Sequence, residues 1–125
     1  MINVNEFEYE DSRWQDVFLH LKSQGFDVYS PGMKVGECTS EYLVVKNDGS
    51  SKHPSFSTDI DLYAVLCYVP KDKYSSLETL VRRVKKSMKE LEPMIKPYGS
   101  QTPSYYDDGF KAHMVSIEYK NYKKL

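Results

Sequence analysis

The residues best suited to chemistry in this chain are its paired aspartates. Asp59 and Asp61 lie two positions apart and so share one face of a predicted strand, and Asp107 and Asp108 follow later in the chain. Carboxylate oxygens are the ligands that divalent cations prefer, so the four side chains could form a cation cluster if the fold joins them. The simpler interpretation, which we favour, is that Asp59 and Asp61 face solvent or another subunit where the strand begins.

The histidines and cysteines do not have the spacing of a metal or redox site. His20, His53 and His113 fall in a predicted helix, loop and strand, without an HxH or HExxH pattern. Cys38 and Cys67 are far apart and belong to no CxxC motif, which favours two reduced structural thiols over a disulfide. The chain also has no GxSxG, Walker or GxGxxG motif. We therefore predict no catalytic residue, no cofactor and a non-enzymatic role.

Charge excludes a protein that binds nucleic acid over its whole surface. Seventeen basic and eighteen acidic residues give a net charge of −1. One predicted helix has a basic face, formed by Arg82, Arg83, Lys85, Lys86 and Lys89. These side chains could contact phosphates, but a solvated face, or one that meets an acidic neighbouring subunit, has the same composition.

Length and hydropathy predict one cytosolic domain, residues 1–125, with no membrane partner. A chain of 125 residues is long enough for a self-supporting core. No apolar run approaches the length that spans a bilayer, and Met1 to Glu10 is acidic, unlike a signal peptide.

The period of the apolar residues predicts the elements that position these side chains. Residues 59–69 alternate as a central strand, apolar on both faces over its second half. A helix with apolar residues at three and four residue spacing follows, opened by a capping box of Ser75 and Glu78 and ended by Pro93.

Further elements lie on either side of this unit. A helix begins at a second capping box, at Ser12, and ends at Gly25, with an apolar stripe of Trp14, Val17, Phe18 and Leu21. The remaining strands are expected at 26–29, 41–46 and 111–119, with an N-terminal arm at 1–11 and a C-terminal tail at 120–125. The predicted fold is α+β, a mainly antiparallel sheet of about four strands with two amphipathic helices packed on it.

Two irregular segments are candidate partner contacts. Residues 47–57 form an inter-strand loop of about eleven residues, far longer than the two to five of most hairpins, and such loops are often functional. A tyrosine-rich and acidic turn lies near residues 104–110, in a chain with eleven tyrosines, a residue type favoured at interfaces. Phe56 could insert into a partner or simply begin the next strand. With the basic helix, the candidate interface residues are Asp48, Lys52, His53, Phe56, Arg82, Arg83, Lys86, Tyr105, Tyr106, Asp107 and Asp108.

The order of elements resembles a known family. An N-terminal helix, the strand Tyr42 to Lys46, a long loop, a longer strand ending in Tyr68-Val69-Pro70, an amphipathic helix and the strand Gly109 to Tyr119 are similar to the tail terminator, or tail completion, proteins of tailed bacteriophages and phage-derived contractile particles. The resemblance covers about residues 12–122 and rests on topology and composition.

The resemblance implies a structural, non-enzymatic role. Proteins of this family form a homohexameric ring that caps the tail tube, stops its polymerisation and meets the sheath or neck. It implies that the protein is found in the bacterial host cytoplasm during assembly and then in the virion or phage tail-like particle, and that the loop at 47–57 reaches outward. From the tyrosines, the acidic turn and the basic helix we further expect tyrosine and charge contacts to join successive subunits.

Three alternatives remain open. Another head-to-tail joining or neck protein is the nearest one. A small nucleic-acid-binding regulator would use the basic helix, and a hydrolase would use Asp59 or Asp61.

Overall fold

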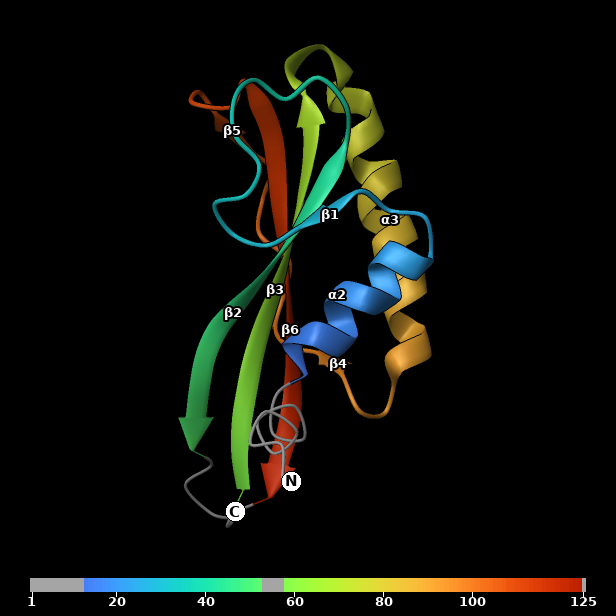
Figure 1. Cartoon of the computed structure of the whole chain (residues 1–125), viewed down its shortest axis with the longest axis vertical. Helices are drawn as coiled ribbons and strands as arrows, with labels where there is room; N and C mark the ends of the chain where they lie inside the picture. The colour runs from blue at the N-terminus through green and yellow to red at the C-terminus, as the bar shows by residue number, and fades with distance from the viewer. Residues whose placement is uncertain (1–12, 53–57, 125) are drawn as a thin grey trace, which may run out of the picture.

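Three long antiparallel strands form the centre of the fold (Figure 1). They are β2 (Tyr42–Lys52), β3 (Thr58–Pro70) and β6 (Ala112–Lys124). The computed structural model describes residues 13–52 and 58–124. β3 pairs with β2 on one side and with β6 on the other, so the predicted central strand is confirmed.

Three short strands complete the sheet. β1 (Val28–Tyr29) runs parallel to β2, whereas β4 (Lys96–Pro97) and β5 (Tyr105–Asp107) run antiparallel to β6 along its outer edge. The sheet therefore has six strands rather than about four. A strand of two or three residues is too short for an alternating pattern, so the sequence could not reveal β4 and β5.

Two helices cover one face of the sheet, α2 (Trp14–Ser23) and α3 (Leu77–Met88), as Figure 1 shows. The predicted α+β fold, mainly antiparallel with two helices on the sheet, is thus confirmed. The core lies between these helices and the odd-numbered residues of β3. Its largest fully buried side chains are Val17, Leu21, Leu43, Val45, Tyr63, Val65, Val69, Leu80, Val84, Met88 and Ile95.

The opposite face of the sheet has no helix among the described residues, and we call it the helix-free face. A second, smaller core covers one end of it, where Cys38, Tyr42, Tyr68 and Ala112 are buried. The loop that precedes β2 is anchored there, since the Cys38 amide donates to the Phe110 carbonyl at 2.7 Å. The even-numbered residues of β3 point to this face, and several of them stay half-buried.

The strands are longer than the sequence predicted. β2 continues through Asn47 to Lys52, with a bulge between Asn47 and Ser50, so the loop predicted at 47–57 is wrong over its first six residues. Residues 53–57 lie outside the described residues. The predicted tail at 120–125 is also wrong up to Lys124, because β6 pairs with β3 to that point. Backbone pairing extends both strands through polar residues, which carry no hydrophobic signal.

The capping box predicted at Ser75 and Glu78 is not observed. Ser75 lies in a 3-10 turn (Lys71–Ser76) that precedes α3, and no side chain caps the helix. Instead the Ser76 hydroxyl donates to the Lys73 carbonyl at 2.7 Å, inside that turn. Ser12 lies outside the described residues. A short 3-10 turn (Lys89–Leu91) continues α3, and the helical path ends before Pro93 as predicted.

Candidate functional site

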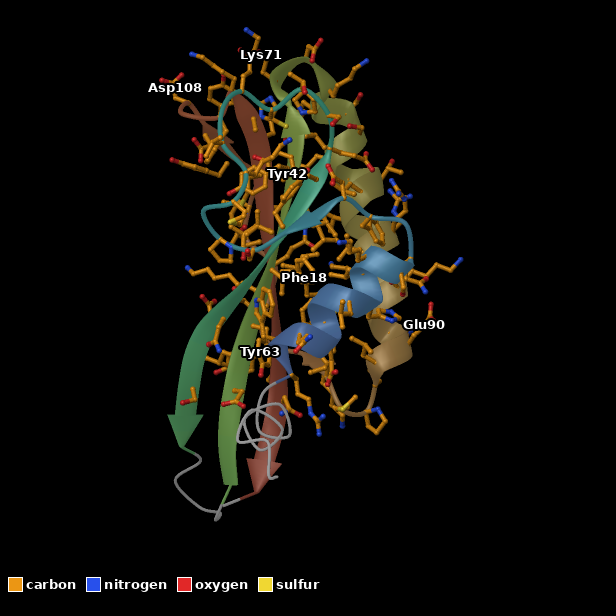
Figure 2. The ribbon with its side chains drawn as sticks, in the orientation of Figure 1. Phe18, Tyr42, Tyr63, Lys71, Glu90 and Asp108 are labelled. Atoms are coloured by element: carbon orange, nitrogen blue, oxygen red, sulfur yellow. The ribbon has the colours of Figure 1, made fainter. Side chains whose placement is uncertain are left out.

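The four aspartates do not converge on a cation site. Asp61 pairs with Asn121, whereas Asp107 pairs with Ala112, which lies opposite Pro70, nine residues further along β3. At a strand rise of about 3.3 Å per residue, Asp61 and Asp107 are therefore about 30 Å apart along the sheet. Figure 2 shows Asp108 and Lys71 at the same end of the molecule, far from the end at which β3 begins. Among the described residues no group of three or more metal-ligating side chains forms, so the alternative of a cation cluster finds no support there.

Asp61 also departs from its predicted position, in which it faces solvent or another subunit. It lies on the helix-covered face in line with Tyr63 and is only 9% exposed. The strand on which it lies belongs to the core, which explains this burial. The structure describes only the backbone of Asp59.

The described histidines bind backbone carbonyls. His20 Nε2 lies 2.8 Å from the Ser87 carbonyl oxygen, which links α2 to α3. His113 Nε2 lies 3.1 Å from the Lys71 carbonyl oxygen, and its ring contacts those of Tyr74 and Tyr106. Both contacts join two elements of the fold and thus have a structural explanation. His53 lies outside the described residues.

Both cysteines are free and buried, in agreement with the predicted reduced structural role. Cys67 lies in the core under the helices and Cys38 in the small core of the opposite face. Burial raises the pKa of the Cys67 thiol to about 12 and also raises the pKa of Cys38. Two buried, mostly protonated thiols are poor nucleophiles.

The basic residues of α3 are partly neutralised within the chain. Arg82 pairs with Glu78 at 2.8 Å, and Arg83 pairs with Glu41 at 2.8 Å while its guanidinium lies over the Phe26 ring. Arg82, Arg83, Lys86 and Thr79 line a shallow hollow of about 170 Å³. The predicted basic face exists, but two of its guanidinium groups already have carboxylate partners.

Strand β5, which leads into the turn before β6, presents two exposed tyrosines, Tyr105 and Tyr106. Asp107 holds the turn, because its Oδ1 accepts from the amides of Gly109 at 2.9 Å and Phe110 at 3.2 Å. Asp108 forms an exposed ion pair with Lys111. Of the two acids, only Asp108 therefore points its charge mainly to solvent.

Two further predicted residues, Asp48 and Lys52, lie near the far end of the sheet. Asp48 sits in the bulge of β2, with Lys46 Nζ 3.4 Å from its Oδ1. Lys52 is described by its backbone alone, which pairs with Asp59. Phe56 lies outside the described residues. The predicted residues whose side chains are described thus form three separate groups, in the bulge of β2, on the outer side of α3, and on β5 with the turn that follows it.

The helix-free face is the most distinctive surface of the molecule. Tyr42, Tyr68, Phe110, Val44 and Leu66 contribute to a hollow of about 170 Å³ that Lys34 and Lys46 also line. The Lys34 ammonium lies over the rings of Tyr29 and Tyr42, at 5.1 and 5.4 Å from their centroids. An aromatic hollow with cationic groups beside it could hold an aromatic or acidic side chain of a partner.

Glu118 also lies on this face, and the sequence did not single it out as a candidate site residue. It lies on β6 opposite Ala64 of β3, which in turn lies opposite Lys46 of β2. Burial and the neighbouring Asp48 carboxyl raise the pKa of Glu118 to about 7. Glu118 and Asp48 are 70 positions apart, so only the pairing of strands brings them together.

The outer edge of β2 is poorly suited to pairing with a further strand. Beyond Val44 no described strand pairs with it, and the Trp14 indole N–H from α2 donates to the Val45 carbonyl at 2.8 Å. Past that point the bulge disrupts the edge, where Asn47 Oδ1 accepts from the Gly49 amide and Gly49 has φ of 94°. These are devices that discourage strand addition, so the faces of this sheet are better contact surfaces than this edge.

A scan against protein-family models and a search of curated proteins find no match to this chain. The geometry of the chain defines its class: it is an α+β domain with helices on one face of a mainly antiparallel sheet. In the described part of the chain, neither helix combines the length and apolar character needed to cross a bilayer.

Proposed function

We propose that this protein is a structural subunit of a phage tail or phage tail-like particle. In this role it forms a ring, expected to be a hexamer, that caps the tail tube, stops its polymerisation and joins it to the sheath or neck. It acts without catalysis or cofactor. It assembles in the bacterial host cytoplasm and then remains in the particle.

The observation that carries the proposal is the helix-free face of the sheet. Over much of its length this face is not covered by a helix among the described residues, and Leu62, Leu66 and Met114 remain only half-buried on it. An antiparallel sheet can leave one face to solvent, but such a face is normally polar. Apolar side chains here favour a protein partner that completes their burial.

The placement of the other candidate groups supports a ring. A heterologous contact requires two different patches, one on each side of a subunit, so that rotation closes the assembly. The helix-free face and the outer side of α3 lie on opposite sides of the sheet (Figure 1). The basic hollow at Arg82 and Lys86 is therefore a candidate for the patch that meets the next subunit.

The direct test is the oligomeric state, measured by light scattering on a sizing column and by negative-stain imaging. Sixfold rings, and capping of preassembled tail tubes, are the expected results. A protein that stays monomeric both alone and with tail tube protein would overturn the proposal.

Variants distinguish the two patches. Leu62→Arg on the helix-free face and Lys86→Glu on α3 are each expected to prevent ring formation while leaving the circular dichroism spectrum unchanged. Leu19→Arg is the matched control, because Leu19 is 50% exposed on α2 and lines neither the aromatic hollow nor the basic hollow. Rings that persist in both test variants would show that the contacts lie elsewhere.

Other roles predict different results. A neck or head-to-tail joining protein would also form rings, but it would bind the connector rather than the end of the tube. A nucleic-acid-binding regulator would show steeply salt-dependent DNA binding, lost on changing Lys86. The ion pairs of Arg82 and Arg83 with glutamates in the same chain weigh against this alternative.

A further inference from the structure

Three strands bring charged side chains together on the helix-free face. Lys46 of β2, Ala64 of β3 and Glu118 of β6 lie in one cross-strand row. The outer two strands of such a row are about 9.6 Å apart, twice the ordinary strand spacing. Because Ala64 presents only a methyl group between them, longer side chains from β2 and β6 can meet above it.

The bulge of β2 places Asp48 at this meeting point. The register shifts between Asn47 and Ser50, so β2 carries one extra residue opposite Leu62. The side chain of Asp48 is only 25% exposed, and its carboxyl group forms a hydrogen bond with that of Glu118. The Ser116 hydroxyl also donates to Glu118 Oε2, at 3.2 Å.

Two carboxyl groups that share a hydrogen bond must hold a proton between them. Burial and Asp48 both raise the pKa of Glu118, while Ser116 and Lys46 lower it, with a result of about 7. The other charged groups near Asp48 and Glu118 are considered strand by strand. Lys120 lies two residues further along β6, with its ammonium over the Tyr98 ring, and β3 contributes no charged side chain beside Ala64.

We propose that Asp48 and Glu118 form a pH-operated clamp between β2 and β6, closed while the two carboxyl groups share a proton and released when both are ionised. The clamp spans the central strand and ties the bulge to the far side of the sheet. On release, two adjacent carboxylates repel each other and the bulged part of β2 opens more often. The inference does not depend on ring formation.

The test measures two quantities, the protonation of Glu118 and the opening of β2. Carbon-13 NMR of the carboxyl groups is expected to give Glu118 a midpoint near 7 in the wild-type protein. In Asp48→Asn, which removes one of the two acids, the midpoint should fall toward its ordinary value of 4.5. A wild-type midpoint already near 4.5 would overturn the clamp.

Opening of the strand is followed by hydrogen exchange of the β2 amides from Val45 to Ser50, corrected for intrinsic rates. Between pH 5 and pH 8 the opening equilibrium is expected to rise at least tenfold, since each unit of pKa difference corresponds to a factor of ten and the pKa of Glu118, at about 7, lies more than two units above its ordinary value of 4.5. Trp14 offers a second probe, because its indole donates to the Val45 carbonyl. Its fluorescence should change over the same pH range.

Glu118→Gln keeps a hydrogen-bonding side chain but cannot ionise, so both pH responses should disappear. Glu41→Gln is the matched control, since Glu41 lies on the same sheet but pairs with Arg83, and it should respond as the wild-type protein does. Responses that survive in Glu118→Gln would assign the effect to another group, such as a histidine, and refute the proposal.

Discussion

A matched pair of leucines in α2 tests how this helix packs on the sheet. Leu21 is fully buried in the core, whereas Leu19, two positions earlier in the same helix, is 50% exposed. Replacing a fully buried leucine by alanine removes its transfer free energy and leaves a cavity, at a total cost of about 2 to 5 kcal/mol. Since the side chain of Leu21 has no exposed surface, we expect Leu21→Ala to lower the free energy of unfolding by about 3 kcal/mol.

Leu19→Ala makes the same chemical change at an exposed site. Alanine favours helix slightly more than leucine does, so the expected change is within about 0.5 kcal/mol. For a domain of this length, the difference between the two variants corresponds to roughly 10 °C in melting temperature.

Urea unfolding followed by circular dichroism measures both variants, with unchanged slopes as the check on two-state behaviour. Equal destabilisation of the two variants, or a Leu21→Ala cost below about 1 kcal/mol, would refute the packing of α2 by this face.

Three further predictions follow. Trp14→Phe keeps an aromatic ring but removes the N–H that donates to the Val45 carbonyl, so thermal unfolding should show a loss of about 1 to 2 kcal/mol; a loss below 0.3 kcal/mol would mean that water replaces this bond. Burial raises the pKa of Cys67 to about 12, so its thiol should stay unmodified by a thiol reagent at pH 8 until denaturant is added, and rapid labelling of the native protein would contradict its burial. Because the pKa of Glu118 is raised to about 7 in the folded protein, folding takes up a proton there, and its contribution to stability should be complete below about pH 4.5 and decline by about 1 to 2 kcal/mol as the pH rises to 7. Urea unfolding at several pH values should show this decline in the wild-type protein but not in Glu118→Gln.

The candidate residues were only partly predictable, and Asp48 illustrates why. Its place between two strands marked it as a possible contact, yet the sequence assigned it to a loop because Asn47, Asp48 and Gly49 are typical turn residues. In the folded protein these residues form a bulge within β2. The local propensity for a turn was satisfied without ending the strand.

The sequence by itself determined the elements whose apolar residues repeat with a clear period. The alternation over 59–69 predicted the central strand, and the apolar stripes predicted both helices and the side they bury. These signals are strong because burial of each apolar side chain is a local requirement that recurs at every turn or every second residue. The absence of CxxC spacing likewise led to the free thiols that are observed.

The tertiary structure alone decided which distant residues meet. Strand register places Glu118 beside Asp48 and separates Asp61 from Asp107, and it buries Asp61 where an exposed acid was expected. It also extends β2 and β6 through polar residues, whose backbone groups find partners in β3. Register depends on the sum of contacts along three strands, and no single stretch of sequence contains that sum.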